Sequence, residues 1–111
     1  MTGELHPGLA SGRWQALTLL EQLANIGSEV GRAARAKTSG NEARLAGALD
    51  RTLDLFDLTL ADDRWANRSR EIARARELVC DFLVGDNVYA STADSLEAYF
   101  RPFAAAVRRR T

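Results

Sequence analysis

The residues best suited to chemistry are three aspartates near the middle of the chain. Asp50, Asp54 and Asp57 are spaced by four and three residues, which places all three carboxylates on one face of a helix. Such a face can hold a hard cation. A di-iron bundle would need a Glu-x-x-His motif on each of two helices. No such motif occurs, and the only histidine, His6, lies near the N-terminus. We therefore interpret the aspartates as a solvated helix face and predict no metal site.

The nucleophilic side chains lack the groups that would activate them. Cys80 flanks the apolar side of a helical segment, and no histidine follows His6 to act as its general base. The serines lack a histidine in the same way. Gly27 and Gly31 lie within a helical pattern rather than after a strand, so they do not form a phosphate-binding loop. The sequence assigns no catalytic residue and no cofactor, and it favours a non-enzymatic protein over an enzyme.

A polar stripe along the first helical segment is the candidate site. It covers an arc of about 80° and consists of Gln22, Asn25, Glu29 and Arg32. On an isolated helix this arc faces water, and Glu29 and Arg32 form an ordinary i,i+3 pair. If neighbours cover the helix on both sides, the stripe needs partners, and Arg68 and Glu71 of the third segment can supply them. A Glu29–Arg68 or Glu71–Arg32 pair would then fix helix register or line a polar pocket at an interface.

Four segments with helical periodicity must position these residues, at about 13–37, 41–61, 64–84 and from 91 or 92 towards the end. Gly40 suits the left-handed position after the first helix, and Asn41 is a good N-cap for the second. Pro102 lies within the last apolar stripe and predicts a kink or break near Arg101. Because short loops between long amphipathic helices favour antiparallel neighbours, we predict an all-α fold. This fold is a small up-down helical bundle with three long helices plus a shorter, Pro-kinked fourth, over residues 13–111, behind a flexible N-terminal arm of residues 1–12.

The first segment also carries a second stripe, made of small residues, beside its apolar one. This stripe consists of Ala24, Gly27, Gly31 and Ala34. Each glycine in a helix interior costs about 1 kcal/mol relative to alanine, so a packing gain should offset that cost. Close approach of a second backbone supplies such a gain. The neighbour is either a helix of the same chain or a helix of another subunit, and the sequence leaves both open.

Composition narrows the classes of partner. The chain has 111 residues, 46% of them hydrophobic, and fifteen basic residues balance fifteen acidic ones to a formal charge of +0. General attraction to nucleic acid or to an anionic membrane is therefore not expected. No apolar run approaches the ~18 residues of a membrane span, and the first residues do not have the pattern of a secretory signal. The cytoplasm is the expected location.

Several runs of sequence resemble a known family. The longest is Leu-Glu-Gln-Leu-Ala-Asn-Ile-Gly-Ser-Glu-Val at positions 20–30, and shorter ones lie at 56–59, 74–77, 80–81 and 99–100. They resemble a family of small prokaryotic all-helical proteins, over nearly the whole chain after the N-terminal arm. This resemblance implies a helical fold and carries no activity with it. The architecture is also faintly similar to HEPN domains, whose RNA-cutting members use an Arg-x(4–6)-His motif. Because that motif is absent here, the similarity implies a binding role at most.

Two hypotheses of different classes follow. The first is a non-enzymatic helical interaction module that self-associates as a homo-oligomer, most simply a dimer, on the basis of the second stripe of the first helix. The alternative is a nucleic-acid-associated accessory protein, HEPN-like or toxin–antitoxin-like, without a nuclease motif. It rests on the arginines of the third segment and on the run Arg108–Arg110, against a net charge of zero.

Overall fold

In the computed structural model, which describes residues 12–110, every regular element is a helix. The long helices are α1 (Leu19–Ser39), α2 (Glu42–Leu60), α3 (Ser69–Leu83) and α4 (Ala93–Arg110), with short 3-10 helices η2 (Trp14–Ala16) and η3 (Asp63–Arg68). No strand occurs within the described range. The predicted all-α bundle of four helices is therefore confirmed. The predicted N-terminal arm lies, except for Gly12, outside the described residues.

Local sequence signals set both ends of α1. The Thr18 hydroxyl accepts the N–H of Glu21, and the Glu21 carboxylate accepts the N–H of Thr18, which makes a capping box. This box starts the helix at Leu19, later than the predicted start near Arg13. At the other end Gly40 takes the left-handed conformation with φ 74°, and the Asn41 side chain accepts the N–H of Arg44 to begin α2. Both of these predicted caps are confirmed.

The third predicted helix is interrupted near its start. The Asp62 carboxylate accepts the N–H of Arg64, and Trp65 leaves the helical region at φ −107°. Residues up to Arg68 therefore form η3, and the α-helix begins only at Ser69. The irregular turn directs the Trp65 indole towards α1, where it donates a hydrogen bond to Gln22.

Two details of the prediction for the fourth helix are wrong, because α4 is not the shortest of the four and the break that was the alternative to a kink at Pro102 does not occur. α4 spans 18 residues, against 15 for α3, and it continues through Pro102. Thr92 and Ser95 cap its start, each side-chain oxygen accepting the other's backbone N–H at 2.9 Å. Proline removes the donor that the Ala98 carbonyl would receive. Pro102 and Ala98 are both exposed, so water can bond that carbonyl and the helix tolerates the proline.

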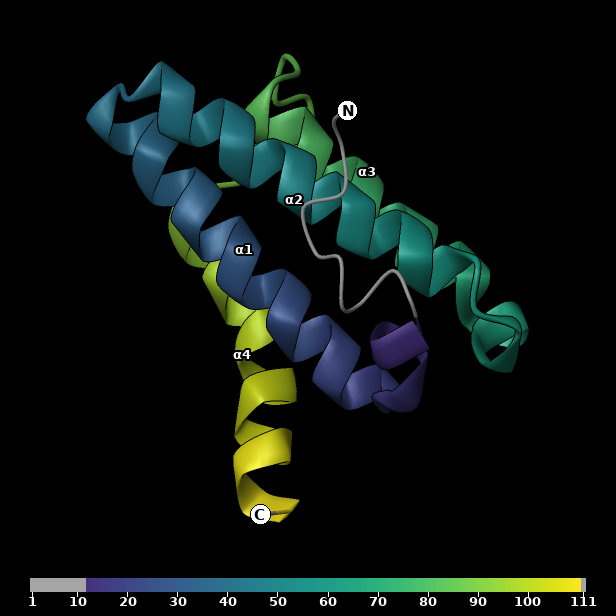
Figure 1. Cartoon of the computed structure of the whole chain (residues 1–111). Coiled ribbons are helices and arrows are strands. Elements are labelled where there is room, and N and C mark those ends of the chain that lie inside the picture. Colours follow the sequence, from purple (N-terminus) through teal and green to yellow (C-terminus); the bar gives the residue numbers. More distant parts are fainter. Residues whose placement is uncertain (1–11, 111) are drawn as a thin grey trace.

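α1 is the central element, and it packs along both α2 and α4 (Figure 1). α2 returns antiparallel to α1, α3 follows behind α2, and the loop at 84–92 leads back to α4. The C-terminal half of α4 extends past α1 in this view. Most of the core lies on α1 and on the helix faces turned towards it, including Ile26, Val30, Phe56, Val79 and Phe100.

Candidate interaction surface

The predicted polar stripe of α1 does not form one site. Gln22 is fully buried and Glu29 nearly so, whereas Asn25 and Arg32 are exposed. The Asn25 side chain donates to the carbonyl of Glu21 within its own helix. Neighbouring elements therefore cover part of this stripe and leave the rest in solvent. Its four residues have different surroundings and different roles.

Glu29 joins α1 to α2. One carboxylate oxygen accepts from Arg32 and the other from Arg51 of α2, both at 3.0 Å. The interhelical pairs predicted with the third segment are wrong, because Arg68 and Glu71 pair with each other at 2.7 Å on the surface. Glu29 and Arg51 lie eleven residues on either side of Gly40 (40 − 29 = 11 and 51 − 40 = 11). Equal distance from the turn of an antiparallel hairpin was the signal that could have identified Arg51.

Gln22 belongs to a buried hydrogen-bond network at the start of α1. Its amide nitrogen donates to the Trp14 carbonyl at 3.0 Å, and its amide oxygen accepts from the Trp65 indole at 2.9 Å. The Trp14 indole donates to the Thr59 hydroxyl at 3.0 Å, and that hydroxyl donates to the Leu55 carbonyl. Because these buried groups are bonded to one another, the network holds η2 and η3 against the long helices.

Asp62 closes the same end of the molecule. Its carboxylate is buried and accepts three hydrogen bonds from the Arg64 guanidinium, the shortest at 2.7 Å. The hydrogen bonds from Arg64 lower the pKa of Asp62 to about 2. Arg64 also donates to the carbonyl of Leu17, at 2.9 Å. The pair therefore ties the end of α2 to the segment ahead of α1.

A groove of about 700 Å³ runs between α1 and α4. Its α1 wall contains the predicted stripe of small residues, Ala24, Gly27, Gly31 and Ala34. The close approach predicted there is found at Gly27, where an added β-carbon would lie 2.7 Å from the Phe100 β-carbon of α4. At Gly31 the nearest atom is the tip of Arg35, at 3.4 Å. α4 thus packs closely on the stripe at Gly27 and leaves space beside Gly31, while Ala34, the next residue of the stripe, is buried.

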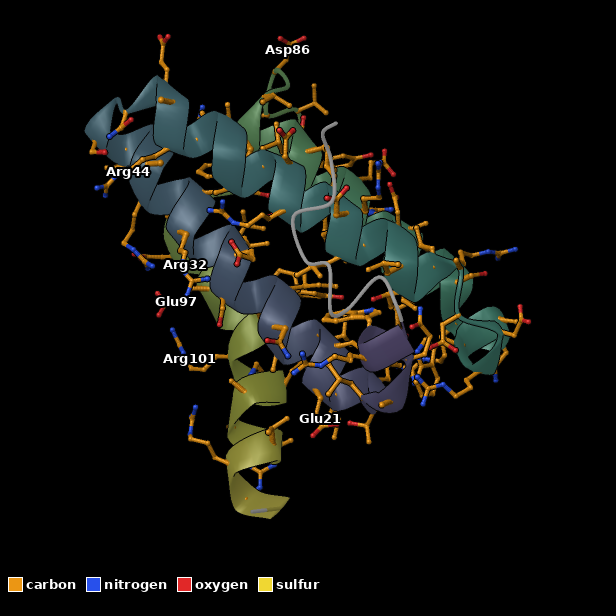
Figure 2. All side chains as sticks on the ribbon, viewed as in Figure 1. Glu21, Arg32, Arg44, Asp86, Glu97 and Arg101 are labelled. Atoms are coloured by element: carbon orange, nitrogen blue, oxygen red, sulfur yellow. The ribbon has the colours of Figure 1, made fainter. Side chains whose placement is uncertain are left out.

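Charged residues of both signs border this groove. Asp94 and Glu97 lie in the first two turns of α4, Arg101 lies at its middle, Arg108 lies near its end, and Arg35 lies on α1. Within the described part of the chain, Asp94, Glu97, Arg35 and Arg101 form no salt bridge. Figure 2 shows Arg32, Glu97 and Arg101 projecting to the same side of the α1–α4 pair. The groove therefore combines a floor of small residues with four charged side chains, Arg35, Asp94, Glu97 and Arg101, that form no salt bridge with another described residue.

A second hollow, of about 660 Å³, lies between α2 and α3. It exposes three apolar side chains of the loop after α3, namely Val84, Val88 and Tyr89. Its acidic groups already have partners, since Asp57 pairs with Arg76, Glu77 accepts from the Tyr89 hydroxyl, and Asp81 accepts the N–H groups of Val88 and Tyr89. This hollow therefore exposes apolar surface, and its acidic groups are already bonded within the chain.

The cysteine and the groups that could hold a metal ion are the remaining candidates for chemistry among the described residues. Burial raises the pKa of the Cys80 thiol, which disfavours the thiolate that nucleophilic chemistry needs. Within residues 12–110 no group of three histidine, cysteine or acidic side chains is arranged to hold a metal ion. No helix in that range is long and apolar enough to cross a membrane.

Comparison with known proteins adds no further guide: no family model, curated protein or solved structure matches this chain. The function is therefore argued from the surfaces themselves.

Proposed function

We propose that the protein is a non-enzymatic helical interaction module that self-associates as a dimer through the groove between α1 and α4. The observation that carries this proposal is the open part of the groove at Gly31, with small residues at its floor and unpaired charges of both signs at its border. Small residues let a second helix approach closely, and a second copy supplies charges of both signs.

The nucleic-acid alternative has less support. It relied on the arginines of the third segment and on the run Arg108–Arg110, and most of the arginines of the third segment have partners in the chain itself. Arg68 pairs with Glu71, Arg76 pairs with Asp57, and Arg74 lies over the Tyr89 ring at 5.0 Å. The groove, in contrast, carries acidic as well as basic groups. A phosphate backbone would repel the acidic groups. Self-association accounts for both signs of charge.

A pair of glycine substitutions tests the proposal. Gly31→Leu fills the groove, whereas Gly47→Leu makes the same change in α2, outside it. Each glycine is inside a helix and has only an arginine tip near its added β-carbon, at 3.4 Å for Gly31 and 3.5 Å for Gly47. In sedimentation velocity at tens of micromolar, the unaltered protein and the Gly47 variant should sediment as dimers of about 24 kDa, twice 12.2 kDa. The Gly31 variant should sediment as a monomer of 12.2 kDa with unchanged helical circular dichroism.

Two outcomes would count against the proposal. A monomeric unaltered protein at these concentrations overturns self-association. A Gly31→Leu protein that remains as dimeric as the Gly47 variant excludes the α1–α4 groove as the contact surface. Titration with duplex DNA and with single-stranded RNA at ~50 mM salt tests the alternative directly, because phosphate contacts are strongest at low salt.

A further inference from the structure

The charges of the groove follow one direction along α4. The acidic groups that line it, Asp94 and Glu97, lie in the first two turns of the helix, and the basic groups follow them, with Arg101 at the middle of the helix and Arg108 near its end. This order also suits the dipole of α4 itself, since acids favour a helix start and cations its end. Glu97 and Arg101 stand one turn apart and project to the same side (Figure 2).

Glu97 and Arg101 have the spacing of a stabilising intrahelical pair, with the acid four residues before the base. They nevertheless form no salt bridge with each other or with another described residue. Both side chains are exposed. Two opposite charges on one side of one helix, each without an ionic partner, are available to a second molecule.

A second copy of this chain fits this order of charge in one orientation. Most homodimers have twofold symmetry, in which each subunit contacts the other through the same surface patch. A twofold axis perpendicular to α4 makes the two α4 helices antiparallel, so that the Glu97 position of one helix faces the Arg101 position of the other. A twofold axis along α4 would make the helices parallel and set acids against acids, which costs free energy and disfavours that orientation.

We propose that the groove is the face of a twofold-symmetric dimer with antiparallel α4 helices. Glu97 of one copy pairs with Arg101 of the partner subunit, and its Arg101 pairs with Glu97 of the partner subunit. The axis passes between the two positions, so one pair of residues forms two identical salt bridges. This inference rests on the proposed self-association and adds the residues that set its orientation.

Charge reversal of each residue, alone and in a mixture, tests the pairing. Glu97→Arg alone places like charges at both contacts of its homodimer, and so does Arg101→Glu alone. When the two variants are mixed in equal amounts, both contacts again join opposite charges. Sedimentation velocity should show each variant with a dimer dissociation constant raised at least tenfold. The mixture should recover the dimer, with one subunit of each variant visible by native mass spectrometry.

A matched control comes from the exposed Arg68–Glu71 pair, which lies outside the groove. Arg68→Glu and Glu71→Arg make the same changes of charge, so each should leave the dimer dissociation constant within twofold of the unaltered protein. Circular dichroism of all four variants checks that the helices are retained.

The outcomes separate this inference from the proposed function. If the unaltered protein is monomeric, both are overturned. If it is dimeric and the Glu97 and Arg101 variants dimerise equally well, the pairing is overturned and self-association stands. If both variants are monomeric and their mixture stays monomeric, the antiparallel pairing is also overturned. The antiparallel pairing is supported only if each variant dimerises more weakly by itself and the dimer is recovered in the mixture.

Discussion

At the scale of single residues, the most constrained polar group is the Gln22 amide. It has no exposed surface, and both of its ends are bonded, one to the Trp14 carbonyl and the other to the Trp65 indole. A primary amide donates from its nitrogen and accepts at its oxygen, so one buried side chain can bond partners on two sides. The indole of Trp14 depends in turn on the Thr59 hydroxyl. Four elements of the fold are joined in this way by a few polar atoms.

Replacing Gln22 with methionine should destabilise the fold. Gln22→Met keeps the length of the side chain but leaves the Trp65 indole N–H and the Trp14 carbonyl without their partner. An unsatisfied buried polar group costs about 1–3 kcal/mol. Urea denaturation should show a loss of that size, whereas Asn25→Met, three residues along on the exposed side, should change stability by less than about 0.5 kcal/mol. Equal effects at both positions would show that the network does not hold the fold.

Asp62 gives stability a defined dependence on pH. Its pKa is about 2 in the folded chain against 3.8 for an ordinary aspartate, so the unfolded chain binds the proton more tightly. The stabilisation is complete above pH 5 and is lost as the pH falls from about 4 to about 2. Because the Arg64 guanidinium is partly exposed, we expect a contribution on the order of 1–2 kcal/mol. Asp62→Asn should remove this part of the acid sensitivity, as measured by thermal melts at pH 2 to 6. An unchanged pH profile in that variant would contradict the assignment.

At the scale of helices, the two glycines of α1 have opposite roles. Gly27 gives room to Phe100, while Gly31 borders open groove. Gly27→Ala would place a β-carbon 2.7 Å from that of Phe100, and overpacking of this kind costs about 1–3 kcal/mol. Gly31→Ala meets only the flexible end of Arg35 and should gain up to about 1 kcal/mol from helix propensity. Denaturant midpoints of the two variants measure the difference, and two shifts of the same sign would contradict it.

The helix ends and the contacts between helices differ in how well the sequence predicts them. The Gly40 end of α1 and the Asn41 cap of α2 were predictable because each depends on one residue and its own backbone. The partner of Glu29 was not, because an ion pair between helices depends on which helices are neighbours. Pro102 was misjudged for a related reason, since its cost depends on whether water reaches the Ala98 carbonyl. Periodicity defines the apolar face of a helix and leaves open which neighbour covers it.

At the scale of the whole molecule, the central position of α1 explains both the core and the groove. With α2 on one side and α4 on another, α1 buries Glu29 and Gln22 and still leaves space beside Gly31 in its small-residue stripe. The sequence predicted that small residues would meet a neighbour, inside the chain or in another subunit. α4 is the neighbour at Gly27. The proposed second subunit is the neighbour at Gly31, so the two alternatives describe adjacent positions of one stripe.

The proposed self-association through this groove would couple dimer dissociation to unfolding of the chain. A dimer that binds only folded subunits stabilises them by mass action, so the melting temperature must rise with protein concentration. A tenfold increase contributes about 1.4 kcal/mol per dimer, which for a domain of this size moves the melting temperature by a few degrees, roughly 3–5 °C. Thermal melts followed by circular dichroism over a hundredfold range of concentration measure this slope. The Gly47→Leu protein should keep the slope, and the Gly31→Leu protein should lose it while it retains a cooperative transition. A melting temperature independent of concentration in the unaltered protein would mean that it unfolds as a monomer.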